Sequence, residues 1–280
     1  VICRVLTAAG HTVSVVGPRG GGQGVTHRVG GLRRHLPGWL GELLEIGYNA
    51  PAFLRLARRI RAQRPDAIYE RYNLYLLAGV FASRLWRLPL VVEVNAPLAL
   101  ERQQQSQLAL PALARWAERT VWRSADRVLP VSGVLAGHVT EAGVPADRVR
   151  IVPNGAEPSC HCENLAAPGA EVRRRYGLDG KTVFGFVGFV RAWHGLDAVL
   201  DVLAGFEPDD VHLLVVGDGP ARPALEEQAA RLGITRAVTF VGTRAHAEIP
   251  GFLGAFDVAL QPAVTPYASP LKLIEYMAAG

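Results

Sequence analysis

The sequence contains little cysteine, almost no lysine and no long apolar run. Three cysteines, Cys3, Cys160 and Cys162, are too few for a disulfide framework. We see no charged and apolar leader of the secretory type at the start of the chain, so we expect a reducing, cytoplasmic location. The most apolar stretch, residues 74–83, is far shorter than the ~18 residues of a membrane-spanning helix. Secreted disulfide-rich and membrane-spanning classes are therefore excluded.

The composition that is present fits a soluble globular protein. The chain has 280 residues, of which 49% are hydrophobic and 20% charged, and it contains 30 glycines. These values exclude disordered, collagen-like and coiled-coil proteins. The length allows one large domain or two ordinary ones.

Charge is unevenly distributed along the chain. Residues 1–150 carry 20 Arg and no Lys against 10 Asp and Glu, whereas residues 151–280 carry 8 Arg and 2 Lys against 15 Asp and Glu. A basic first half indicates an anionic partner, such as nucleic acid, a lipid surface or a phosphorylated acceptor. A solvated arginine-rich surface explains the same count equally well.

Short β-branched runs alternate with amphipathic stretches, which predicts parallel sheets with crossover helices. The predicted strands are 12–16, 66–70, 90–94, 127–131, 148–152, 182–187, 211–216, 237–241 and 257–261. The predicted helices are 50–63, 74–87, 108–123, 133–141, 196–204, 221–232 and 247–255, and the chain opens within a further helix. Two tandem, Rossmann-like, doubly wound α/β sheets are the simplest interpretation.

A domain boundary is predicted where turn formers accumulate, at residues 153–168. The sign of the charge changes at the same place. We therefore predict an N-terminal domain over 1–155 and a C-terminal domain over 156–280, and expect both to be incomplete. Ligands of open α/β sheets bind at the carboxyl ends of strands, so the active site is expected in a cleft between the two halves.

Three local motifs are weak. Gly217-Asp218-Gly219-Pro220 follows a strand like a dinucleotide loop, but the sixth position is Arg222 and no acidic residue ends the next strand. A tight turn is the favoured interpretation. The triplet 180–182 precedes a strand, so it is not a P-loop. Residues 160–162 (Cys-His-Cys) lack the second ligand pair of a zinc site.

The strongest site signal lies in residues 266–280. Ser269 is a good N-cap and Pro270 a good first helical residue, so a helix is predicted to begin there. Its free amides, from Leu271 and Lys272, form a pocket for an anion. Lys272 and Glu275 share one helical face, which suits a phosphate beside ribose hydroxyls. A surface ion pair on an ordinary helix explains the same spacing.

Segments in order along almost the whole chain resemble the retaining glycosyltransferases of family 4, which have the two-Rossmann GT-B fold. They include AAGHTVSVVGP, RPDAIYERY, ADRVLPVSGVLAGHV, DRVRIVPNGAE, FGFVGFVRAWHGLDAVL, VHLLVVGDGP and SPLKLIEYMAAG. Each segment is weak alone, whereas their joint order is specific. In this family the first strand and its glycine loop would precede Val1, and the rest of the second domain would follow Gly280.

The resemblance implies transfer of a sugar from a nucleotide diphosphate donor to a glycan or lipid-linked acceptor, with retention and without a cofactor or metal. The donor binds mainly the second domain and the acceptor mainly the first. Donor-binding positions carried over from the family are Gly188, Gly217, Thr243, Ser269, Pro270, Leu271, Lys272 and Glu275.

The sequence departs from the family at three catalytic positions. Glu275 matches the second glutamate of the family's ExxxxxxxE motif, but the first is replaced by Tyr267. Phe189 and His194 stand where the family has the Arg and Lys that clamp the diphosphate. Arg191 lies between them and is predicted to supply the missing charge.

On the acceptor side, Asn95 follows a predicted strand where many relatives have histidine, and Glu93 and Glu101 lie nearby in sequence. Capping of the strand end explains Asn95 almost as well. The stretch 53–61 has one apolar helical face and several arginines. It suits either packing on the sheet or contact with an anionic membrane.

Two rival functions remain open. A sugar-nucleotide epimerase of the same architecture hydrolyses its donor without an acceptor, and product analysis separates it from a transferase. A nucleic-acid or membrane binding module would use the basic half instead. Aromatic residues are not interleaved with the arginines as stacking platforms require, so we expect no nucleic-acid partner.

Overall fold

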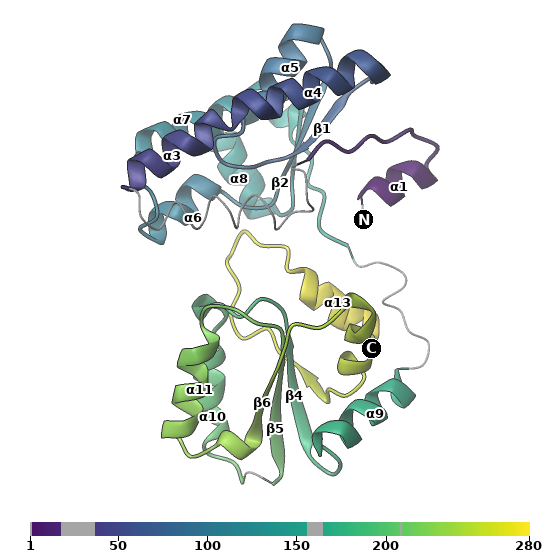
Figure 1. The fold of residues 1–280 in the computed structure, drawn as a ribbon, viewed down its shortest axis with the longest axis vertical. Helices are drawn as coiled ribbons and strands as arrows, with labels where there is room; N and C mark the ends of the chain where they lie inside the picture. The colour runs from purple at the N-terminus through teal and green to yellow at the C-terminus, as the bar shows by residue number, and fades with distance from the viewer. Residues whose placement is uncertain (1, 18–36, 156–164, 208) are drawn as a thin grey trace. The chain divides into compact units, whose positions relative to one another are not determined.

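The computed structural model describes residues 2–17, 37–155, 165–207 and 209–280, which form two compact α/β units (Figure 1). Unit 1 comprises Val1–Pro153 together with the short segment Tyr267–Ser269. Unit 2 comprises Asn154–Pro266 and Pro270–Gly280.

Unit 1 is built on a parallel sheet with the order β1-β2-β3. Its strands are β1 (Ile68–Arg71), β2 (Leu90–Val94) and β3 (Arg127–Pro130). In the central strand β2, Leu90, Val92 and Val94 are fully buried, and the alternate residues are half-buried. This alternation places every second side chain of β2 in the core and leaves Glu93 toward the polar side.

The helices of unit 1 are α1 (Ile2–Ala8), α3 (Gly38–Gly47), α4 (Asn49–Gln63), α5 (Ala78–Trp86), α6 (Leu98–Gln104), α7 (Pro111–Ser124) and α8 (Gly133–Glu141), with the short 3-10 helix η1 (Ala146–Arg148). Helix α1 buries no residue and contributes nothing to the core. Apolar residues of α4, α5, α7 and α8 pack in one cluster with the strands. Tyr267 lies in the same cluster, which ties its segment to unit 1.

Unit 2 is built on a parallel sheet with the order β6-β5-β4-β7. Its strands are β4 (Thr182–Val187), β5 (Val211–Val216), β6 (Val238–Gly242) and β7 (Val258–Ala259). All of β5 is buried, and its residues alternate between two cores: Leu213 and Val215 in one, Leu214 and Val216 in the other. Both faces of the sheet are therefore covered, as a doubly wound sheet requires.

The helices of unit 2 divide between these two faces. They are α9 (Ala166–Tyr176), α10 (Leu196–Leu203), α11 (Arg222–Arg231), α12 (Ile249–Leu253) and α13 (Leu271–Ala279), with the 3-10 helices η3 (Ala192–His194), η4 (Thr235–Ala237) and η5 (His246–Glu248). Helices α10 and α11 contribute to one core, and α9 and α12 to the other. The fold class predicted from the sequence, two parallel α/β sheets, is confirmed.

Two predicted strands are wrong. Residues 12–16 form no strand. Their valines lie outside the core, and Val15 is 69% exposed. Burial of these side chains therefore does not offset the conformational entropy that the backbone would lose in forming a strand. Residues 148–152 make only a single bridge, between Val149 and Val128, and two further hydrogen bonds to β3. That segment follows β3 without extending the sheet.

Other elements differ in their bounds. Helix α5 begins at Ala78 and not at Leu74, because Tyr75 has φ 65° and a left-handed residue cannot continue a right-handed helix. Strand β7 is only Val258–Ala259, since the Asp257 carboxylate accepts the Val183 N–H at 2.7 Å in place of a backbone partner. Helix α9 begins inside the predicted linker.

Candidate functional site

The carboxyl edge of the unit 2 sheet is formed by closely packed glycines. Gly188 follows β4 with φ 147°, and Gly217 follows β5 with φ 130°. A Cβ on Gly217 would collide with the carbonyl oxygen of Gly188, and a Cβ on Gly219 would collide with the backbone of Val190. Conformation therefore favours glycine at 188, the close approach of backbone requires it at 219, and both reasons apply at 217. The result is an edge lined by backbone, which a ligand can approach closely.

Lys272, in the first turn of α13, extends its side chain over this edge. Its ammonium lies 4.0 Å from the centre of the buried Phe186 ring and 3.3 Å from Nε2 of His194. A Cβ on Gly188 would contact the Lys272 Cε and Nζ at 3.4 Å. We call Phe186, Gly188, His194 and Lys272 the lysine cradle. Among the described residues no carboxylate lies within ion-pair distance of Lys272.

His194 brings a neutral imidazole to the cradle. Its Nε2 lies 3.3 Å from the Lys272 ammonium, and its Nδ1 lies 3.3 Å from the Arg191 backbone nitrogen. A neutral ring has one acceptor nitrogen, so it can accept from only one of these two donors. Burial, together with the charges of Lys272 and Arg191, lowers the pKa of His194 to about 4. Burial also lowers the pKa of Lys272 to about 8. The ring thus leaves one of the two donors without an acceptor, and an acceptor-only group such as a phosphate oxygen would satisfy it.

The start of α13 adds further positive potential. Pro270 has ψ 111° and is the N-cap, so the prediction of Ser269 as N-cap and Pro270 as first helical residue is wrong by one position. No side chain caps this end. The amides of Leu271, Lys272 and Leu273 have no acceptor within the helix. A cation in the first turn opposes the helix dipole, so Lys272 destabilises an empty helix end and would favour an anion there.

Tyr276 fixes the position of α13 on the sheet. Its buried hydroxyl accepts the Val187 N–H at 2.9 Å, at the point where the short strand β7 has left the edge of β4. Burial raises the pKa of Tyr276 to about 12, so this hydroxyl stays protonated at neutral pH. The bond sets the helix register, and with it the place of Lys272 one turn earlier.

The other residues of unit 2 that were predicted to bind the nucleotide sugar are not part of the lysine cradle. Glu275 is half-buried on α13, three residues after Lys272. Leu271 and Thr243 are exposed. Arg191 is exposed, and its guanidinium lies 5.1 Å from the centre of the Phe189 ring. The structure therefore brings together Gly188, His194 and Lys272, with Gly217 against the Gly188 backbone.

The predicted acceptor-side residues lie in unit 1, where Glu93 and Asn95 bind each other. The Glu93 carboxylate accepts hydrogen bonds from the Tyr69 hydroxyl and the Asn95 amide, both at 2.6 Å. Arg71 lies 3.8 Å from the same carboxylate. The Tyr69 pKa is raised, chiefly by burial and then by this bond. Asn95 is thus a partner of Glu93, at the end of β2.

Tyr267 and Ser269 cluster with unit 1 and not with α13. The Tyr267 hydroxyl donates to Glu101 at 2.6 Å, and the Tyr267 carbonyl accepts the Ser132 hydroxyl at 2.7 Å. Ser132 also caps α8 by accepting the Leu135 N–H. The single donor of the Tyr267 phenol is therefore used by Glu101.

Sequence reasoning did not single out Phe186 and Tyr276. Phe186 looks like any apolar strand residue, and only the structure shows the Lys272 ammonium on its ring. Tyr276 had a signal, since it stands one helical turn after Lys272 in a segment already selected. A tyrosine on the buried side of that helix indicates a hydroxyl that needs a partner.

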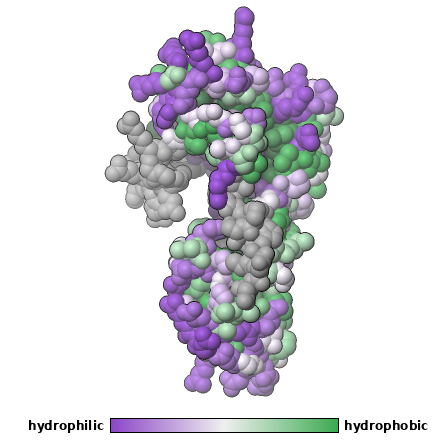
Figure 2. All heavy atoms as spheres, turned by 90° about the vertical axis from the view of Figure 1, so that its right-hand side faces the viewer, coloured by the Kyte–Doolittle hydropathy of each residue, from purple (hydrophilic) through white to green (hydrophobic). Residues whose placement is uncertain are grey.

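Neither a metal site nor a membrane span is found in the part of the chain that the structure describes. No three His, Cys, Asp or Glu side chains there are grouped to hold a metal ion, and no helix there has the length and apolarity to cross a bilayer. Residues 160–162 lie outside the described residues. On the face drawn in Figure 2, hydrophilic side chains cover much of the surface between apolar patches.

Comparisons with known proteins define the class of this chain. Residues 2–155 match the family model of the glycosyl transferase 4-like domain, and residues 181–280 match that of the glycosyl transferases group 1. The chain therefore belongs to the glycosyltransferases of this family.

Two curated relatives come from Streptomyces kanamyceticus. The chain is 32% identical over 248 residues to a 2-deoxystreptamine glucosyltransferase, covering 83% of this chain and 62% of that protein. It is 29% identical over 228 residues to an alpha-D-kanosaminyltransferase, covering 79% of this chain and 58% of that protein. The chain thus spans about three fifths of the length of these relatives.

Solved structures share the fold. The structure of HepE (Alr3699) from Anabaena in complex with UDP-glucose superposes with a TM-score of 0.67 at 25% identity, covering 82% of this chain and 61% of that one. This similarity agrees with the GT-B class predicted from the sequence.

Proposed function

We propose that the protein is a retaining glycosyltransferase whose unit 2 binds a nucleotide diphosphate sugar through the lysine cradle. The observation that carries this proposal is Lys272, a half-buried cation at a helix start with no carboxylate partner among the described residues. The HepE complex supports it, because that related structure holds UDP-glucose.

The cradle suits the departing diphosphate. As the bond between the sugar and the diphosphate breaks, negative charge grows on the phosphate oxygens. The Lys272 ammonium and the first amides of α13 are donors fixed in place before the reaction, so they stabilise that charge without reorganising, and His194 helps to hold the ammonium in position. The exposed Arg191 side chain adds a second cation, and the Glu275 carboxylate accepts hydrogen bonds from the ribose hydroxyls. No step of this mechanism requires a metal.

For the acceptor we propose a lipid-linked glycan or polysaccharide, bound through unit 1 at the cytoplasmic side of the membrane. A second acceptor class is favoured by the two Streptomyces relatives, whose names describe a 2-deoxystreptamine glucosyltransferase and a kanosaminyltransferase. Small aminocyclitols and lipid-linked glycans should therefore be offered side by side, with the anomeric configuration of each product determined by NMR.

The test of donor binding is calorimetric titration of the protein with UDP, GDP and ADP. We expect one of the three to bind through the cradle, and Glu275→Ala to weaken its binding about tenfold, since two ribose hydrogen bonds to a carboxylate are lost. Glu275→Gln keeps the acceptor oxygen and should lose less. Absence of binding by all three nucleotides would exclude the proposed donor site. Hydrolysis of the sugar nucleotide without transfer would favour the epimerase.

A further inference from the structure

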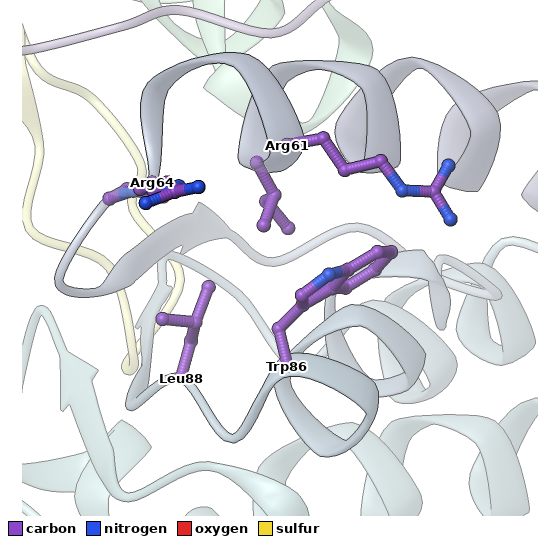
Figure 3. A pocket seen from close by; sticks show the side chains of 6 residues that line it. Arg61, Arg64, Trp86 and Leu88 are labelled. Atoms are coloured by element: carbon purple, nitrogen blue, oxygen red, sulfur yellow. The ribbon is translucent and has the colours of Figure 1, made fainter.

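In unit 1, the C-terminal ends of α4 and α5 enclose a hollow of about 360 Å³ (Figure 3). It is lined by Ile60, Arg61, Arg64, Pro65, Trp86 and Leu88. Figure 3 shows Arg61 and Arg64 on one side and Trp86 and Leu88 on the other. The Arg61 guanidinium lies 5.6 Å from the centre of the Trp86 ring. The hollow thus combines an apolar and aromatic wall with two cationic groups.

The two helices around this hollow carry arginines and no acidic residue. Neither α4 (NAPAFLRLARRIRAQ) nor α5 (AGVFASRLW) contains Asp or Glu. Together with their C-cap residues they carry seven arginines: Arg55, Arg58, Arg59, Arg61, Arg64, Arg84 and Arg87. No ion pair joins any of these seven to another described residue. The nearest carboxylate in sequence is Asp66. Seven full charges also outweigh the partial negative charges of the two helix ends.

Two of these arginines occupy positions where glycine would be more stable. Arg64 closes α4 with φ 45°, and Arg87 closes α5 with φ 54°. Both are left-handed C-caps, which favour glycine because a Cβ is strained there. The closing bonds are made by the backbone, from the Arg64 N–H to the Ile60 carbonyl and from the Leu88 N–H to the Ser83 carbonyl. The helix ends therefore need no arginine side chain, which points to a role for the charge itself.

Exposed apolar side chains lie among the arginines. Leu54 on α4 and Phe81 and Leu85 on α5 are each more than half exposed. Leu54, Arg58 and Arg61 are spaced on one face of α4, and Phe81, Arg84 and Leu85 on one face of α5. Cations mixed with exposed apolar groups match the boundary between lipid headgroups and acyl chains.

We propose that this α4–α5 arginine surface docks on an anionic lipid bilayer, with a phosphate-bearing headgroup in the hollow between Arg61 and Arg64. The Trp86 and Leu88 side chains would contact the glycerol region, and Leu54, Phe81 and Leu85 the outermost acyl carbons. Docking of this kind needs no nucleotide sugar, so its test stands apart from that of the proposed transferase activity.

The experiment is sedimentation of the protein with vesicles of phosphatidylcholine alone and with vesicles containing phosphatidylglycerol. We expect binding only to the anionic vesicles, weakening as salt screens the charges. Arg64→Gly with Arg87→Gly should reduce binding about fivefold for each arginine removed. The same double variant should raise the midpoint of thermal unfolding by about 2 to 4 °C or more, because strain at two helix ends is relieved.

If the double variant binds anionic vesicles more weakly but unfolds at a higher temperature, the two arginines act in docking and not in stabilising the fold. Arg236→Gln removes an exposed arginine of unit 2 and should change neither quantity. UDP titration of the double variant should match the unaltered protein, which shows that unit 2 is intact. Undiminished vesicle binding by the double variant, or equal binding to neutral vesicles, would overturn the proposal. Binding of soluble glycerol 3-phosphate by the hollow without vesicle binding would also overturn it, since a free anion would then be the ligand.

Discussion

Polar side chains gather at the carboxyl ends of the strands in both units, but their hydrogen-bonding groups have different kinds of partner in the two. In unit 1, Glu93 is held by Tyr69 and Asn95, and Glu101 by Tyr267. In unit 2, Lys272 faces an aromatic ring and the neutral imidazole of His194, and no carboxylate pairs with it among the described residues. Groups that satisfy one another stabilise a fold, whereas a desolvated donor without an acceptor favours a ligand. The contrast indicates that unit 2 is prepared for an anion and that the unit 1 network chiefly fixes the strand end.

The largest effect on UDP affinity is expected when the charge of Lys272 is removed. Lys272→Met keeps the length and apolar stem of the side chain, and we expect UDP affinity to fall about 10- to 100-fold, as for loss of a charged hydrogen bond. Lys181 is the only other lysine of the chain and precedes the opposite end of β4. Lys181→Met should leave UDP affinity unchanged in calorimetry. Equal losses in the two variants would show that Lys272 acts only through general charge.

As pH rises, the titration of Lys272 should change UDP affinity and the free energy of unfolding in opposite directions. Because the pKa of Lys272 is lowered to about 8, the ammonium is lost above that pH and UDP affinity should fall about tenfold from pH 7 to pH 9. The unfolded chain keeps its proton up to its ordinary pKa of 10.5, so it binds more protons than the folded chain between these values. The Lys272 contribution to the free energy of unfolding therefore rises with pH across this window, whereas tyrosines with raised pKa values, such as Tyr69 and Tyr276, contribute the opposite slope near its upper end.

Calorimetry and urea unfolding at matched pH values measure these two slopes. Lys272→Met should flatten the slope of UDP affinity, and the difference between the stability slopes of the two proteins measures the Lys272 contribution. A slope of UDP affinity that persists in Lys272→Met would assign the titration to the nucleotide or to another group.

A smaller effect is expected from Tyr276→Phe. The ring remains, but the Val187 N–H loses its acceptor and α13 loses its fixed register. We expect UDP affinity to fall about fivefold and unfolding to be easier by about 1 kcal/mol. Tyr176→Phe removes a hydroxyl that accepts from Arg244 in the same unit, and should affect stability alone. In a Lys272→Met background the Tyr276 effect on UDP affinity should vanish if Tyr276 acts by positioning Lys272.

The sequence predicted the parallel strands of both sheets well, because an apolar run such as β5 has no stable place except a sheet centre. It failed at residues 12–16, whose β-branched residues suit a strand but pair with none in the structure. It also placed Lys272 and Glu275 correctly on one helix. It could not show that Phe186 and His194 meet Lys272, because those contacts depend on how a strand, a loop and a helix pack together.

The smallest effect on nucleotide affinity is expected from Tyr267→Phe, which tests the other side of the comparison. The change removes the hydroxyl that donates to Glu101, so unfolding of unit 1 should become easier by about 1 kcal/mol. UDP lacks the sugar that is transferred, and its affinity should stay within about twofold, since the lysine cradle lies in unit 2. A loss of turnover with the nucleotide sugar at unchanged UDP affinity would place the phenol at the donor sugar, as the resemblance implies. Unchanged turnover would instead leave Tyr267 and Glu101 as a structural pair, and the functional contrast between the two units would then be complete.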